Sequence, residues 1–170
     1  KKGGLRATLE FDSADGRYAR SVLIPTLAYA ASLVPEIADD PESVDRAMRL
    51  GYNWKTGPFE LIDKLGPAWL AAAIADHGLS VPPLLGAVGD GTFYRVRDGQ
   101  LQLFSGTDYE NVRRPDGVLL LEDVKRAGPP IARNMSASLW DIGDGVACLE
   151  FTSKMNSLNP FILWMIDKAV

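Results

Sequence analysis

The chain of 170 residues is 46% hydrophobic and 24% charged, and it carries a net charge of −4. This composition predicts a globular protein with a substantial hydrophobic core, arranged as one domain or slightly more. The acidic balance excludes a general affinity for nucleic acid, and no apolar run approaches the ~20 residues that a membrane span needs.

The first predicted element is a long helix over residues 16 to 38. Either Ser13 or Asp15 can cap its N-terminus. Pro25 lies inside it, which predicts a kink or a restart at that point. The helix is indicated by apolar residues that recur at three- and four-residue steps, namely Tyr18, Val22, Leu23, Leu27, Ala30, Ala31 and Val34.

Three shorter helices are predicted next, each starting at a proline that follows a capping or flexible residue. The first starts at Asp40-Pro41 and ends at Gly51, and the second starts at Gly57-Pro58. The third starts at Gly66-Pro67 and ends at Gly78. The short links between these helices predict neighbours that run antiparallel or cross steeply.

Strand patterns follow the helices. Residues 92 to 96 and 100 to 104 flank Asp98-Gly99, the strongest two-residue signal for a hairpin turn. That turn would place Arg95 and Gln102 on one face of the hairpin. Residues 137 to 142 and 146 to 152 flank a second turn, so we expect one or two small hairpins.

Two segments of the C-terminal part are harder to interpret. Residues 116 to 127 fit either a strand or a short helix, and residues 128 to 136 are predicted to be a linker because they begin with Gly-Pro-Pro. Asn159-Pro160 predicts a last helix, whose apolar face looks unfinished. We expect Phe161, Trp164 and Met165 to stay partly exposed unless a later part of a longer chain, or a homodimer, covers them.

Several polar residues could suggest a functional site, but a structural role explains them better. The carboxylates at residues 39, 40, 42 and 45 lack the spacing of a calcium loop, so we interpret them as charge near a helix N-terminus. The only histidine, His77, is expected to lie solvated at a helix C-terminus. The basic pairs at 113–114 and 125–126 are interpreted as solvated. No metal site is predicted.

The lone cysteine, Cys148, cannot form an internal disulfide and is interpreted as a packing residue within a strand. The first residues lack the apolar stretch of a secretory signal. We therefore expect a cytoplasmic protein whose fold does not depend on oxidation.

Residues 45 to 66 carry the most specific pattern of the chain. Ala47 to Gly51 (AMRLG) and Gly57 to Asp63 (GPFELID) resemble the signature of the C-terminal domain of L-3-hydroxyacyl-CoA dehydrogenases. Gly16 to Leu27 (GRYARSVLIPTL) is similar to the segment that opens this domain in the family. The resemblance implies a mainly helical α+β fold, with a bundle of about four to six helices between residues 13 and 90.

A second resemblance follows near the C-terminus. Asp144 to Leu149 (DGVACL) and Asn156 to Asn159 (NSLN) are similar to the start of a crotonase, or enoyl-CoA hydratase, domain. The order of the two matches resembles bacterial fused dehydrogenase–hydratase proteins, in which two copies of the dehydrogenase C-terminal domain precede the crotonase. This implies a dehydrogenase-like domain at 1–127, a linker at 128–136 and the start of a crotonase-like domain at 137–170.

The same resemblance implies a parent protein that oxidises 3-hydroxyacyl-CoA to 3-oxoacyl-CoA with NAD, with enoyl-CoA hydration on the fused part. NAD binding needs G-x-G-x-x-G between a strand and a helix. The run from Gly86 to Gly91 has the wrong spacing, and the family's catalytic His segment is missing. We therefore expect no catalytic, cofactor-binding or metal-binding residues here, and we expect the parent's Rossmann and crotonase domains as partners.

Two residues are candidates for contact with an acyl-CoA substrate. Arg20 stands where the family has a substrate-contacting Asn, and a guanidinium cannot reproduce an amide's donor and acceptor. Lys154 is nearest to a basic residue that touches CoA in crotonases. The interpretation is a second, degenerate copy that acts as a scaffold. The alternative is a stand-alone acyl-CoA-binding or protein-interaction domain without enzymatic activity.

Overall fold

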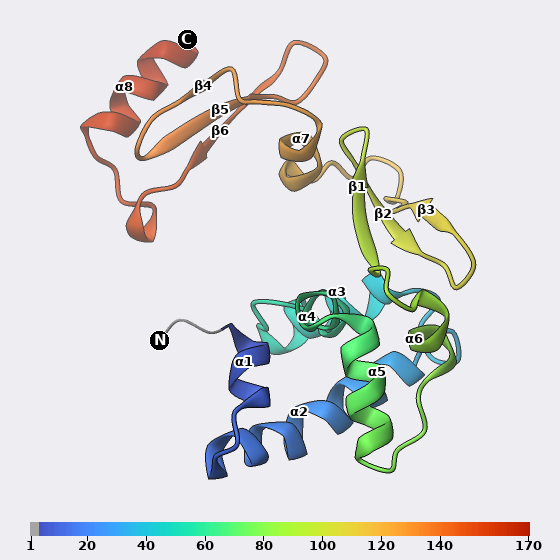
Figure 1. Ribbon diagram of the computed structural model, residues 1–170. Helices are drawn as coiled ribbons and strands as arrows, with labels where there is room; N and C mark the ends of the chain where they lie inside the picture. Colours follow the sequence, from blue (N-terminus) through green and yellow to red (C-terminus); the bar gives the residue numbers. More distant parts are fainter. Residues whose placement is uncertain (1–3) are drawn as a thin grey trace. The chain divides into compact units, whose positions relative to one another are not determined.

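Two compact units make up the chain in this computed structural model, which describes residues 4–170 (Figure 1). The helical unit comprises the described residues up to 95 together with 102–112. The C-terminal unit comprises 96–101 together with 113–170. The predicted mainly helical α+β fold is confirmed by helices that carry most of the helical unit and by two small antiparallel sheets.

The helical unit packs its helices around one hydrophobic core. Its helices are α1 (Leu5–Glu10), α2 (Ala14–Ser32), α3 (Pro41–Tyr52), α4 (Pro58–Leu65), α5 (Pro67–Asp76) and α6 (Pro83–Val88). The longest of them, α2, contacts α1, α4, α5 and α6. The core is centred on side chains without solvent exposure, among them Leu9, Ile24, Leu27, Phe59, Ile62, Leu70, Ile74, Leu85 and Phe93.

The helix starts follow the predicted capping. The Gly16 N–H donates to Ser13 Oγ at 3.0 Å, and the Ser43 N–H donates to Asp40 Oδ1 at 2.7 Å. Two details differ from the prediction. Helix α2 is continuous through Pro25 and ends at Ser32, so no restart occurs. Helix α3 runs past Gly51 to Tyr52, and the residue that caps its C-terminus, Asn53, adopts the left-handed conformation at φ 54°.

A three-stranded sheet follows α6 in the chain, with β1 (Tyr94–Arg97), β2 (Gln100–Phe104) and β3 (Tyr109–Asn111) in that order. The predicted turn is confirmed, since Asp98 and Gly99 have φ values of 52° and 75°. Arg95 Nε donates to Gln102 Oε1 at 2.7 Å, so these side chains share a face as expected. Strand β3 was not predicted, because three residues are too few to show an alternating pattern.

The C-terminal unit is a second small sheet with a helix on its face. It contains α7 (Leu121–Ala127), β4 (Ala132–Arg133), β5 (Ala137–Asp141), β6 (Ala147–Phe151), a 3₁₀ turn (Lys154–Asn156) and α8 (Pro160–Ala169). The strands pair antiparallel in the order β4-β5-β6. Asn159 caps α8 by accepting from two backbone N–H groups.

The C-terminal unit begins earlier in the chain than the sequence suggested. Residues 121–127 form a helix, and Lys125 Nζ pairs with Glu150 of β6, so this helix belongs to the same unit. The segment expected to be a linker contains β4, whose residues pair with β5. Met165 is buried against β5, contrary to expectation, whereas Phe161 and Trp164 are exposed. Among the described residues, no helix has the length and apolar character that crossing a bilayer requires.

Candidate functional site

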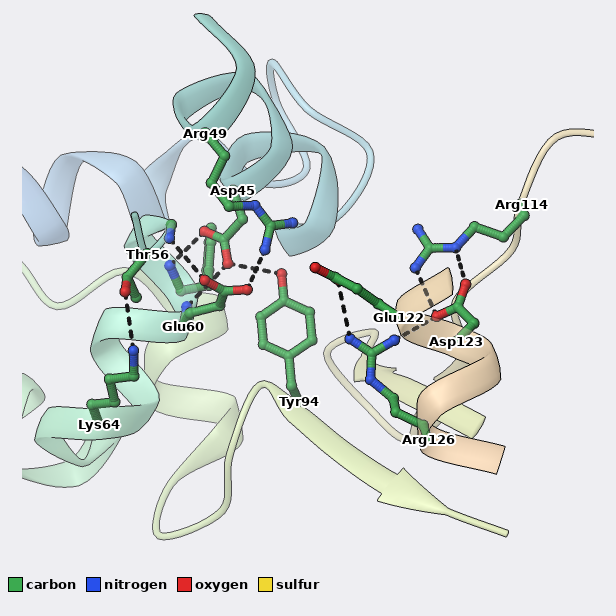
Figure 2. Close-up of polar contacts among 12 residues, drawn as sticks. Asp45, Arg49, Thr56, Glu60, Lys64, Tyr94, Arg114, Glu122, Asp123 and Arg126 are labelled. Carbon is green, nitrogen blue, oxygen red and sulfur yellow. Dashed lines mark hydrogen bonds and ion pairs between the residues drawn. The ribbon is translucent and has the colours of Figure 1, made fainter. Parts of the chain in front are cut away.

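A buried carboxylate lies at the centre of the densest polar contacts in the helical unit. Asp45, on α3, has no solvent exposure. Its Oδ1 accepts from the Phe59 N–H at 2.7 Å, and its Oδ2 accepts from the Glu60 N–H at 3.0 Å and the Tyr94 hydroxyl at 3.0 Å (Figure 2). One side chain therefore joins α3, the first turn of α4 and strand β1.

The sequence explains why α4 needs this carboxylate. The first N–H groups of a helix have no partners within the helix, and the residue before it normally supplies a side-chain acceptor. Here that residue is Gly57, which has no side chain. Asp45 takes the place of the missing cap from a neighbouring helix.

Gly57 is required by the closeness of this approach. A Cβ atom built on Gly57 would lie 2.3 Å from Asp45 Cγ and 2.5 Å from Asp45 Oδ1. The backbone of Gly57 has an ordinary φ of −70°, so conformational freedom is not the reason for glycine here. Any side chain would push the carboxylate off the α4 amides.

The two carboxylates of the GPFELID segment, Glu60 and Asp63, also accept from backbone N–H groups, and Glu60 pairs in addition with an arginine. Glu60 Oε2 accepts from the Gly57 N–H at 2.9 Å, and its Oε1 pairs with Arg49 of α3. Asp63 accepts from the Phe93 N–H at 2.7 Å and from the Tyr94 N–H at 2.9 Å. These bonds hold α4 to α3 and to the start of β1.

Burial changes the ionisation of this cluster. It raises the pKa of Asp45 to about 6, and the three donors that Asp45 accepts from offset only part of that rise. Burial also raises the pKa of Asp63. The pKa of the Tyr94 hydroxyl is raised by burial and by the adjacent Asp45 charge. Tyr94 therefore stays a protonated donor across the physiological range.

The cluster is suited to holding helices together and not to proton transfer with a substrate. A general base must lie within hydrogen-bond reach of the proton that it removes. Asp45 is fully enclosed, and both of its oxygens already accept protein donors. Glu60 and Asp63 are only partly buried, and their oxygens also accept protein donors.

The residues predicted to contact substrate lie in different units. Arg20, in the helical unit, is partly buried, and its Nη1 donates to the Leu9 carbonyl at 2.5 Å, which ties α2 to α1. Lys154, in the C-terminal unit, is exposed on the 3₁₀ turn. His77 is exposed at the C-terminus of α5, as predicted, with its Nδ1 2.8 Å from the Ala73 carbonyl oxygen.

The C-terminal unit holds a second set of ion pairs (Figure 2). Arg114 Nε lies 2.9 Å from Asp123, which also pairs with Arg126. Lys125 pairs with Glu150, and this hydrogen bond is the main reason that the pKa of Glu150 is lowered. The interpretation as merely solvated was therefore wrong for Arg114, Lys125 and Arg126, whereas Arg113 is exposed. Within residues 4–170, no three His, Cys, Asp or Glu side chains come together as a metal site would require.

The glycine run after α5 does not fit the pyrophosphate of a dinucleotide. Such a site needs a strand that leads into a glycine turn and then a helix. Here Gly86 lies within helix α6, and Gly89 and Gly91 follow it on the way to β1. The order of elements is reversed, so this run offers no place for NAD.

Asp45 is the residue of this site that the sequence did not single out. It was grouped with Asp39, Asp40 and Glu42 as charge at the start of its own helix, whereas it caps a different one. The available signal was Gly57: a helix start without a capping side chain needs an acceptor from elsewhere.

Comparison with known proteins agrees with this architecture. Residues 16–110 match the family described as "3-hydroxyacyl-CoA dehydrogenase, C-terminal domain". The chain belongs to this family. The match begins at Gly16 in α2 and ends in β3, so it contains Asp45, Gly57, Glu60 and Asp63.

Three curated relatives place this dehydrogenase-type domain within longer proteins. The chain is 34% identical over 172 residues to a "Probable 3-hydroxyacyl-CoA dehydrogenase" of Bacillus subtilis (strain 168), covering 99% of the chain and 22% of the relative. It is 27% identical to a "Putative fatty acid oxidation complex trifunctional enzyme" of Rickettsia felis, covering 93% and 19%. The protein of that name in Rickettsia prowazekii is 24% identical, with 98% and 21% covered.

The chain thus spans about a fifth of the length of the curated relatives it matches. No solved structure matches it significantly.

Proposed function

We propose that this chain is a non-catalytic scaffold segment of a multidomain fatty-acid β-oxidation enzyme. The parent protein oxidises 3-hydroxyacyl-CoA to 3-oxoacyl-CoA with NAD, and it carries enoyl-CoA hydratase activity on a fused domain. The names and lengths of the relatives support the dehydrogenase assignment and the presence of further domains. The Rossmann domain that holds NAD and the crotonase domain are then the segment's partners within one polypeptide.

The proposal rests on the direction in which the carboxylates of residues 45–66 point. Asp45, Glu60 and Asp63 direct their carboxylates to backbone N–H groups of the same unit, with Asp45 fully buried. A catalytic site needs acid and base groups that a substrate can reach. The carboxylates of this segment instead fix α3, α4 and β1 relative to one another.

The degenerate-copy interpretation is part of the same proposal. Arg20 occupies the position of the family's substrate-contacting Asn, and its guanidinium is used to hold α1. Residues 137–170 are proposed to be the start of the crotonase-like domain. In this view Lys154 lies on an exposed turn from which it can meet a CoA phosphate.

An activity assay on the full gene product tests the proposal. NADH formation from 3-hydroxybutyryl-CoA should be unchanged, within about twofold in kcat and KM, when Arg20 is replaced by Ala. The 170-residue chain alone should give no turnover above the blank. Turnover by the isolated chain, or a large rise in KM for Arg20→Ala, would contradict the scaffold role.

A binding measurement separates this proposal from a stand-alone acyl-CoA-binding domain. Titration of the 170-residue chain with an acyl-CoA should give weak binding or none. Tight binding that Lys154→Ala or Arg20→Ala abolishes would favour the alternative.

A further inference from the structure

One arginine of the helical unit is held in place while most of its donors stay unused. Arg95, on β1, is partly buried. Its Nε donates to Gln102 Oε1 at 2.7 Å, and its guanidinium carbon lies 3.7 Å from the centre of the Tyr109 ring. A guanidinium carries five N–H donors, of which this arrangement uses one. Among the described residues, neither Nη atom of Arg95 donates to a protein acceptor.

The two groups that hold Arg95 are themselves fixed. Gln102 Nε2 donates to Asn111 Oδ1 at 2.8 Å, which sets the amide of Gln102 so that its oxygen faces Arg95. The Tyr109 hydroxyl donates to the Thr92 carbonyl at 2.6 Å and accepts from the Thr92 N–H at 3.3 Å. The plane and the direction of the guanidinium are therefore set by the protein before any ligand arrives.

The charge of Arg95 has no counterpart on its own face of the sheet. Among the strand residues of the helical unit, the only other charged side chain is Glu110 of β3. Successive residues of a strand point to opposite faces, so Glu110 lies on the face opposite to Tyr109 and Asn111. The face that carries Arg95, Gln102, Tyr109 and Asn111, which we name the polar face, therefore keeps a positive charge.

The unused part of Arg95 matches one kind of ligand group. Two Nη atoms on a planar guanidinium donate in parallel to two oxygens on one centre, as in a phosphate or a carboxylate. Immobilising a free arginine on binding normally weakens affinity roughly two- to tenfold, and here the fold has already ordered the side chain. A phosphate dianion carries twice the charge of a carboxylate and is attracted more strongly.

We propose that Arg95 anchors an oxyanion-binding site on the polar face, which takes the phosphate or carboxylate group of a small-molecule ligand through paired hydrogen bonds to its two Nη atoms. A single fork binds weakly, with a Kd on the order of millimolar for the bare anion. This site goes beyond the scaffold function and does not depend on it, because anion binding would be observed whatever reaction the parent enzyme catalyses.

NMR titration of the 170-residue chain measures this binding directly. The Arg95 Nε–H signal is the reporter, because its hydrogen is held by Gln102. Inorganic phosphate is added up to about 50 mM while sodium chloride keeps the ionic strength constant, so that general screening does not change. The signal should shift and saturate.

Sodium acetate, titrated in the same way, distinguishes the two ligand groups. Tighter binding of phosphate assigns the site to a phosphorylated ligand, and tighter binding of acetate assigns it to a carboxylic acid. Absence of a saturable shift with both anions would overturn the proposal.

Two variants test the fork, and the backbone amide signals of β2 report their binding. Arg95→Lys keeps the charge but removes the fork, and it should weaken phosphate binding roughly tenfold or more. Gln102→Met removes the acceptor that fixes Nε and adds no charge, and it should weaken binding roughly three- to tenfold.

Arg46→Lys is the matched control, because Arg46 is an exposed arginine on α3 that stacks on no described aromatic ring. This variant should bind phosphate like the unmodified chain. Amide spectra that are unchanged away from the sheet show that each variant is folded. Unchanged binding in either site variant, or an equal loss in Arg46→Lys, would refute the assignment to Arg95.

Discussion

The close approach of Gly57 to the Asp45 carboxylate gives the sharpest prediction, which concerns Gly57→Ala. The added methyl would lie 2.3 Å from Asp45 Cγ, so the carboxylate has to move by more than 1 Å to restore ordinary contact. A movement of this size breaks the hydrogen bonds from the Phe59 and Glu60 N–H groups, which are now 2.7 and 3.0 Å long.

The cost follows from these two bonds. A hydrogen bond to a charged group contributes about 1.5–3 kcal/mol, and losing both destabilises the fold by about 3–6 kcal/mol. Replacing glycine also restricts the unfolded chain, which offsets about 0.4–1 kcal/mol. We expect a net loss of about 2 kcal/mol or more, which is a large part of the roughly 5–15 kcal/mol that stabilises a typical domain.

Urea unfolding, followed by circular dichroism and by tryptophan fluorescence, measures this loss. Gly51→Ala is the matched control, because Gly51 lies in α3 with no atom within 4 Å of its added methyl. The control should be as stable as the unmodified chain or more stable by about 0.5–1 kcal/mol. In an Asp45→Gly background, Gly57→Ala should cost much less than alone. A Gly57→Ala chain within 1 kcal/mol of the unmodified one would refute the reasoning.

Three further predictions concern Asp45, its hydrogen-bond donor Tyr94, and the ion pair between Lys125 and Glu150. Because burial raises the pKa of Asp45 to about 6, the folded state binds its proton more tightly than the unfolded state between pH 4 and 6. The free energy of unfolding should therefore fall as pH rises through this window, by up to about 3 kcal/mol. In urea titrations at several pH values, Asp45→Asn should make the free energy of unfolding depend less steeply on pH. If the dependence on pH is unchanged in this variant, groups other than Asp45 cause it. Tyr94→Phe removes one donor to Asp45 and should cost about 1–2 kcal/mol in thermal unfolding; an unchanged Tm would mean that this bond contributes nothing. Lys125→Met should return the lowered pKa of Glu150 toward its ordinary value, which carboxylate NMR titration can follow; a pKa that stays low would show that Lys125 is not the cause.

Much of the fold could be predicted because its signals are local. Helix starts at Asp40-Pro41, Gly57-Pro58 and Asn159-Pro160 and the turn at Asp98-Gly99 depend on residues a few positions apart, and all four are observed. The left-handed residue that ends α3 was misplaced at Gly51, because Asn53 can adopt the same backbone conformation and glycine is the commoner choice.

The candidate site was less predictable because its contacts join distant residues. Asp45 and Tyr94 are 49 positions apart, and no periodicity relates a carboxylate on one helix to the amides of the next. The same holds for Lys125 and Glu150, whose pairing decides that α7 belongs with the second sheet. A resemblance to a family predicts the fold, but only the packed structure shows which carboxylates accept hydrogen bonds from backbone N–H groups.

A helix that depends on a neighbour for its cap cannot melt by itself. The amide hydrogens of Phe59 and Glu60 lie in the first turn of α4, where fraying usually allows rapid exchange with solvent deuterium. Here they are held by α3, so they should exchange only when α3 separates from the body of the domain, as one cooperative opening. A pair of first-turn amides thereby becomes a built-in reporter of how firmly a different helix is docked.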